Sequence, residues 1–343
     1  MLQENKVKLS IIIPVYNEEN YISELFEQLK NFFNDKNIEI IFVNDGSVDN
    51  SKNLIKSFKD HNDYIFQYYF IDIKKNSGKG KAIQLGLNKS KGKYVLFLDA
   101  DLELDTKDAF DMYQMIEDKK EIKCIFGSRY LTGKLKKNNY FFNNLVGKIN
   151  SLIFNIFFLQ SLTDVHCGLK IIHREVLEKI KITLNDFGIE LDLASQIVRN
   201  NFFIYEYGVS YYFRTKLQGK KITWLDGIKS LYYLFKIRFI DNDRYTNLSL
   251  IYSIIYMSYV GSYFGMGSGN TLFIMFFGII GSIIGLNFFI LSSSIIFLFI
   301  YIGSLFGQGN GKTLSVTVFF CFGIFIARYI KKYLFKSKVS KWF

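Results

Sequence analysis

Short apolar runs, each followed by a polar turn and then by a helical pattern, most limit how this chain can fold. Residues 8–16 and 38–43 are two such runs, and apolar side chains recur at helical spacing after each, at 22–33 and 54–58. Strand-length runs that alternate with helices favour right-handed crossovers and a parallel sheet. The sequence therefore predicts an α/β fold in which the loops after the strands meet at one edge of the sheet.

A third apolar run ends in three acidic residues at alternating positions, Asp99, Asp101 and Glu103. Residues two apart in an extended chain face the same way, so these carboxylates can converge on one hard cation. Glu18 and Asp45 follow the other two runs, and ligands of open α/β sheets bind at this edge. A single acidic cluster is usually a solvated loop. Acidic residues after three separate strands instead predict a binding crevice.

Five short motifs follow one another along the first 130 residues. They are 14–18 (Pro-Val-Tyr-Asn-Glu), 43–49 (Val-Asn-Asp-Gly-Ser-Val-Asp), 76–80 (Asn-Ser-Gly-Lys-Gly), 99–101 (Asp-Ala-Asp) and 127–129 (Gly-Ser-Arg). In this order and spacing they resemble the family 2 glycosyltransferases with the nucleotide-sugar-binding fold called GT-A. Residues 164–170 and 211–222 further resemble the polyprenyl-phosphate subgroup, which includes dolichol-phosphate mannose and glucose synthases. The resemblance covers about residues 8–240.

The resemblance implies a donor site for a nucleotide-diphosphate sugar of the GDP-mannose or UDP-glucose type. Asp45 and the loop from Pro14 to Glu18 would hold the nucleoside, a task that suits carboxylates because they accept N–H and O–H bonds. Lys79 lies between two glycines, which let the backbone approach a phosphate. The implied donor-binding residues are Pro14, Tyr16, Asn17, Glu18, Asp45, Lys79 and Asp99.

The resemblance also implies Mg²⁺ or Mn²⁺ as a cofactor. Asp99 and Asp101 would hold the ion against the diphosphate, which neutralises charge on the leaving group. Glu103 is a third candidate ligand, although dolichol-phosphate mannose enzymes often carry Gln at this position, so its role stays open. His166 beside Cys167 lacks partners at zinc spacing and is interpreted as an ordinary loop histidine.

The acceptor side lacks an obvious general base. A lipid phosphate is already anionic at neutral pH, so it needs cations and positioning rather than deprotonation. Four basic residues are therefore candidates to hold the acceptor phosphate: Arg129, Arg214, Lys220 and Lys221. Solvated surface charge is the alternative in a chain of net charge +12. Asp101, Arg129 and Arg214 are the expected catalytic residues.

Residues beyond 245 are expected to form a membrane domain, because long uncharged segments gather there. Four spans are predicted, at 246–264, 271–286, 288–306 and 314–331, with three as the alternative. Residues 1–222 would form the GT-A domain, 223–245 interfacial amphipathic helices, 246–335 the all-α transmembrane domain and 336–343 a basic tail. Residues 141–162 are also expected at the membrane surface, with a buried core helix as the equal alternative.

The basic tail and the even number of spans predict that both ends of the chain are cytoplasmic. No signal segment is apparent before the first strand, so we expect the catalytic domain to stay in the cytoplasm. The chain is expected to be an integral protein of a prokaryotic cell membrane. The predicted partners are a nucleotide sugar, undecaprenyl or dolichyl phosphate and the lipid membrane, with no nucleic acid. The predicted function is metal-dependent, inverting transfer of one sugar to the polyprenyl phosphate. Alternatives are a processive polysaccharide synthase of the same family and a non-catalytic membrane scaffold or translocation partner.

Overall fold

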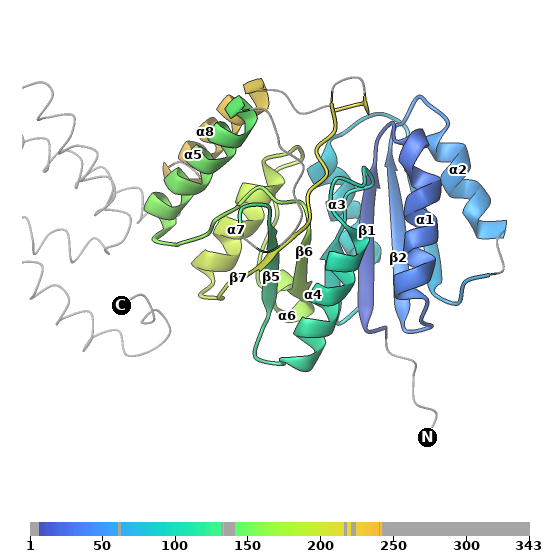
Figure 1. Cartoon of the computed structure of the whole chain (residues 1–343). Coiled ribbons are helices and arrows are strands. Elements are labelled where there is room, and N and C mark those ends of the chain that lie inside the picture. Colours follow the sequence, from blue (N-terminus) through green and yellow to red (C-terminus); the bar gives the residue numbers. More distant parts are fainter. Residues whose placement is uncertain are drawn as a thin grey trace, which may run out of the picture. The chain divides into compact units, whose positions relative to one another are not determined.

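A seven-stranded sheet forms the centre of the described structure (Figure 1). The computed structural model describes residues 7–60, 63–131, 133, 141–215, 218–220, 224–239 and 241. Along the sheet the strands lie in the order β3-β2-β1-β4-β6-β5-β7. Their bounds are Leu9–Val15 (β1), Ile38–Asp45 (β2), Gln67–Ile73 (β3), Tyr94–Phe97 (β4), Cys124–Ser128 (β5), Lys170–His173 (β6) and Tyr205–Gly208 (β7).

The sheet is mostly parallel. β1 pairs in parallel with β2 and β4, β2 with β3, and β5 with β7, whereas β6 runs antiparallel to both of its neighbours. In this register Leu9 lies opposite both Ile38 and Tyr94, so the three strands that the sequence predicted are adjacent. The predicted α/β class is confirmed.

Helices cover both faces of the sheet (Figure 1). Their bounds are Glu19–Phe33 (α1), Ser51–Ser57 (α2), Lys79–Lys89 (α3), Thr106–Asp118 (α4), Phe141–Phe158 (α5), Arg174–Leu177 (α6), Ile189–Arg199 (α7) and Trp224–Phe239 (α8), with a 3₁₀ turn at Phe58–Asp60. The alternation of side chains along β1 explains the two layers. Ile11 and Ile13 belong to the core that includes α1 and α4, whereas Ile12 faces Gly86 of α3.

Residues 1–234 and 235–343 are two compact units. Among the described residues, no helix combines the length and the apolar character that crossing a membrane requires. The four predicted spans and the basic tail lie beyond residue 241, outside the described residues.

Candidate functional site

The acidic residues that end or follow β1, β2 and β4 line one cavity of about 400 Å³ at the carboxyl edge of these strands. Glu18, Asp45, Asp99, Asp101 and Glu103 all contribute to its wall. The parallel pairing of the three strands brings them together, since β1 lies between β2 and β4. The structure therefore gathers the residues that the sequence predicted to meet.

Asp45 fixes the loop that precedes α3. Its two carboxylate oxygens accept hydrogen bonds from the backbone N–H groups of Ser77 and Gly78, each at 2.8 Å. Gly78 has φ 96°, and a Cβ there would meet the carbonyl oxygen of Asn185 at 2.4 Å. A side chain cannot be placed here without moving the backbone, so the glycine lets Asp45 bind this turn.

Asn17 joins the loops after β1 and β2. It has φ 51°, a conformation that asparagine adopts more readily than most residues. Its side-chain oxygen accepts the N–H of Val48 at 2.9 Å, and its own N–H donates to the Ser47 hydroxyl at 3.0 Å. The loop from Pro14 to Glu18 is thereby held against the loop that follows Asp45.

Lys79, the first residue of α3, connects two carboxylates across the cavity wall. Its Nζ lies 2.7 Å from Asp99 and 2.9 Å from Glu190 on α7. The fully buried Lys170 also contacts Glu190 and donates to the carbonyl of Cys167. Burial opposes ionisation of Glu190, but the two lysines outweigh it and lower the pKa of Glu190 to about 2.

Arg214 connects the ends of β1 and β4. Its guanidinium donates to Glu18 at 2.8 and 3.4 Å and to Asp101 at 3.0 Å. Glu103 in turn accepts two hydrogen bonds from Lys220, at 2.8 and 2.6 Å, and one from the Tyr211 hydroxyl at 3.1 Å. The segment that carries these basic residues is therefore bound to the acidic edge of the sheet.

The carboxylate oxygens of the cavity suit a divalent cation whose remaining ligands would come from a diphosphate. Burial and the charges of Asp99 and Glu103 raise the pKa of Asp101 to about 7, although Arg214 opposes the shift. A cation among these oxygens would relieve this crowding of negative charge. No three acidic, histidine or cysteine side chains of the described part are grouped to hold a metal alone. Mg²⁺ commonly needs only one or two carboxylates beside phosphates, so Asp99 and Asp101 fit.

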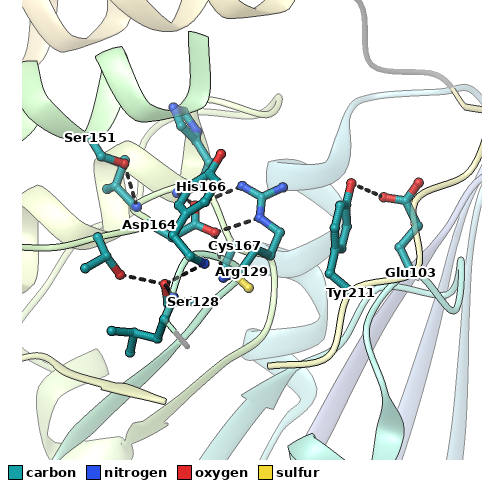
Figure 2. A network of polar contacts seen from close by, with 12 residues as sticks. Glu103, Ser128, Arg129, Ser151, Asp164, His166, Cys167 and Tyr211 are labelled. Atoms are coloured by element: carbon teal, nitrogen blue, oxygen red, sulfur yellow. Dashed lines mark hydrogen bonds and ion pairs between the residues drawn. The ribbon is translucent and has the colours of Figure 1, made fainter. Parts of the chain in front are cut away.

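Arg129 after β5 is bound by Asp164 (Figure 2). Its Nε and Nη2 donate to the two oxygens of Asp164 at 2.6 and 2.8 Å, and its backbone N–H donates to the same carboxylate at 3.1 Å. Asp164 is 1% exposed, and the arginine holds the pKa of this carboxyl below its usual value against the effect of burial. The fork geometry fixes the guanidinium in the cavity wall.

The cavity includes nearly all the predicted site residues. Arg129, Arg214 and Lys220 line it together with Pro14, Tyr16 and Lys79, whereas Lys221 lies outside the described residues. The metal role of Glu103 stays a prediction, and its oxygens already bind Lys220 and Tyr211. Sequence reasoning assigned no role to Glu190, which stands in an ordinary amphipathic helix pattern. Asp164 and Lys170 belong to the motif at residues 164–170, which by itself predicts no role for either residue.

Known proteins share both the sequence pattern and the fold. The family model described as glycosyl transferase family 2 matches residues 10–181. A dolichyl-phosphate β-glucosyltransferase of Saccharomyces cerevisiae is 30% identical over 246 residues, 66% of this chain and 72% of that protein. The Dictyostelium discoideum protein of the same name is 28% identical over 64% of this chain and 72% of its own length.

A solved structure of glucosyl-3-phosphoglycerate synthase from Mycobacterium tuberculosis, in complex with Mn²⁺ and UDP-glucose, has the same fold. It superposes with a TM-score of 0.53 at 15% identity and covers 69% of this chain and 83% of that chain. The resemblance inferred from the five motifs is confirmed, and the fold is of the GT-A type.

Proposed function

Since this chain belongs to glycosyl transferase family 2, we propose that it moves one sugar, with inversion, from a nucleotide-diphosphate sugar to a polyprenyl phosphate. The chain is a glycosyltransferase; the donor, the acceptor and the cytoplasmic membrane face belong to the proposal. Two dolichyl-phosphate β-glucosyltransferases are similar over about two thirds of the chain, which supports glucose as the sugar and dolichyl or undecaprenyl phosphate as acceptor. UDP-glucose is the donor that we propose to test.

One observation carries the proposal: carboxylates and basic side chains alternate around a single cavity. Asp99 and Asp101 face the cavity together with Lys79 and Arg214. A metal-bound diphosphate matches this arrangement, because the ion meets the carboxylates and the phosphate oxygens meet the basic groups. The metal would be held by Asp99 and Asp101, and it would neutralise the charge that develops on the departing diphosphate.

Three carboxylates of the cavity, Asp45, Glu18 and Glu190, are poorly suited to deprotonate an acceptor. Asp101, with a pKa of about 7, is assigned to the metal in this proposal. Asp45 is occupied by two backbone N–H groups, and Glu18 is bound by Arg214. Glu190, with a pKa of about 2, stays ionised between two lysines and is a poor proton acceptor at neutral pH. A phosphate nucleophile has no need of a base, whereas a sugar hydroxyl does. Arg129 is fixed by Asp164 where it could hold such an anion.

The surfaces of α5 and α8 support a site next to a membrane. α5 buries Asn150 and Ser151 but exposes Leu152 at 58%, and α8 exposes Tyr232 at 58%. Other exposed apolar residues of this surface are Leu145, Ile149, Ile156, Leu159 and Ile228. An apolar surface of this kind suits the lipid boundary, where a polyprenyl chain would lie. The predicted spans that follow in the sequence would anchor it.

The test uses the purified full chain in detergent with Mn²⁺, radiolabelled UDP-glucose and undecaprenyl or dolichyl phosphate. We expect a glucose-labelled lipid phosphate, and we expect EDTA to abolish its formation. Asp101→Asn should lower the rate by about 10²-fold or more, because charge stabilisation in the transition state appears in the rate. Asp118→Asn, at an exposed residue outside the cavity, is the matched control. Label in a polymer, or full activity in EDTA, would contradict the proposal.

A further inference from the structure

Three polar side chains of the described cavity have a buried atom without a hydrogen-bond partner. One is Nε of Arg214, which lies 3.6 Å from Glu103 within an ion pair. The other two are the side-chain oxygen of Asn150 on α5 and Nε2 of His166. Both residues line the cavity that holds the acidic edge, and Asn150 is only 2% exposed. Buried polar atoms are normally hydrogen bonded, because leaving them without a partner is costly. A ligand group that bonds both atoms would remove this cost.

The turn that carries His166 extends from the predicted diphosphate site to α5. At one end, a Cβ on Gly168 would lie 2.1 Å from Oδ2 of Asp99 and 2.9 Å from Nζ of Lys79, so the turn touches both side chains. At the other end, the N–H of Val165 donates to the Ser151 hydroxyl at 3.2 Å (Figure 2). His166 and Asn150, the neighbour of Ser151, thus lie beside the place where a diphosphate would end.

The chemistry of these two atoms favours a hydroxyl group over an anion. Burial lowers the pKa of His166 to about 4, although the charge of Asp164 opposes the shift, so the imidazole is neutral at physiological pH. A neutral ring nitrogen either donates or accepts, and an amide oxygen accepts. A hydroxyl can serve both, whereas a phosphate oxygen has no hydrogen to give to the amide oxygen. Sugar hydroxyls are the hydroxyl groups attached to the diphosphate in the proposed donor.

We propose that Asn150 and His166 bind hydroxyl groups of the sugar that is transferred and so determine which nucleotide sugar the enzyme uses. This inference rests on the proposed function and adds the sugar-binding residues to it. Asp164 positions His166, because Oδ1 of Asp164 accepts the backbone N–H of His166 at 3.3 Å. Both carboxylate oxygens of Asp164 are in turn fixed by Arg129.

The test separates binding of the sugar from binding of the nucleotide. In the full chain with Mn²⁺, Asn150→Ala and His166→Ala should each raise KM for UDP-glucose by about 3- to 10-fold, the effect of one lost neutral hydrogen bond. The Kd of UDP alone, measured by calorimetry, should stay the same. UDP-glucose analogues that lack one hydroxyl identify the contact, since the correct analogue loses affinity with the wild type and not with the variant.

Conservative variants distinguish a sugar from the acceptor phosphate. Asn150→Asp keeps an acceptor for a hydroxyl and should restore much of the affinity that Asn150→Ala loses, and His166→Gln should do the same for His166→Ala. If Asn150→Asp is worse than Asn150→Ala and raises KM for the polyprenyl phosphate instead, the pair binds the acceptor and the inference is wrong.

Asn155→Ala is the matched control on the same helix. Asn155 bonds the backbone of Leu162 through both side-chain atoms, at 2.8 and 2.9 Å, so its loss should lower thermal stability and leave KM for UDP-glucose unchanged. An unchanged KM in both Asn150→Ala and His166→Ala would mean that only water meets these atoms, and would overturn the inference. A wild type that consumes no UDP-glucose would overturn the proposed donor, and the inference with it.

Discussion

At the scale of single residues, two basic side chains of the cavity are each shared between carboxylates. Lys79 contacts Asp99 and Glu190, and Arg214 contacts Glu18 and Asp101. A buried ion pair is weak evidence for stability, because desolvation offsets much of the attraction. Removing one partner of such a pair is strongly destabilising, since the remaining charge is left buried without compensation.

Glu190→Gln should therefore destabilise the catalytic domain. The fully buried Lys170 would lose its carboxylate partner, and the partly buried Lys79 would keep only Asp99. We expect a loss of about 3–5 kcal/mol in the free energy of unfolding, measured by urea denaturation. The pKa of Glu190 falls from 4.5 to about 2 on folding, so its contribution is complete above pH 4.5 and is lost as pH falls toward 2. The stability of the variant should accordingly depend less on pH in this window.

Glu175→Gln is the matched control for this change. The Glu175 side chain is 44% exposed and pairs with Lys179 at 2.9 Å and with Lys123 at 3.4 Å on the surface, where an ion pair contributes about 0–1 kcal/mol. A Glu190→Gln variant as stable as this control would show that Lys79 and Lys170 do not depend on the carboxylate.

At the scale of secondary-structure elements, α5 and α8 approach closely at one glycine. The two helices lie side by side in Figure 1, and a Cβ on Gly227 of α8 would lie 2.3 Å from Cγ1 of Val146 on α5. Both residues line the cavity, as do Asn150 of α5 and Ser230 of α8. The packing of α5 against α8 therefore sets the shape of the part of the cavity wall that these two helices form.

Gly227→Ala should show the importance of this contact. Alanine favours a helix over glycine by about 1 kcal/mol, but overpacking costs about 1–3 kcal/mol, so we expect a neutral to destabilising change. In a Val146→Ala background the obstructing methyl group is absent, and the same substitution should become stabilising. Thermal unfolding of the four proteins gives the coupling energy, which we expect at about 1–2 kcal/mol. Additive effects would mean that the two helices are not in firm contact here.

At the scale of the whole molecule, the arrangement of the chain across a membrane is a prediction from the sequence. Six basic residues lie at the end of the last predicted span or after it, whereas the loops expected on the outer side of the membrane carry only Lys312. They are Arg328, Lys331, Lys332, Lys336, Lys338 and Lys341. Such a bias keeps a segment in the cytoplasm.

A tag after Phe343 should accordingly be reached by a protease or a membrane-impermeant label only from the cytoplasmic side. The measurement compares intact cells with inverted vesicles, and a tag in the loop at residues 265–270 serves as the outward-facing control. Labelling of the carboxyl terminus from outside would require an odd number of spans, and the division of residues 271–306 into two would be wrong.

The sequence by itself determined the local elements and the acidic edge. Apolar runs predicted β1, β2 and β4, and the acidic residues after them lie at one sheet edge because parallel strands share that edge. Each motif that predicted the donor site is a short contiguous stretch, so it could be recognised in the sequence directly.

Only the tertiary structure decided which side chains meet across distant segments. Arg214 binds Glu18, 196 residues away, and Lys79 meets Glu190 through the packing of α3 against the turn before α7. No local pattern specifies such pairs, because they depend on how elements far apart in the chain pack. The same holds for Asn150 and His166. Their residue types are ordinary for a helix face and a loop, and burial in one cavity makes them candidates for recognising a sugar.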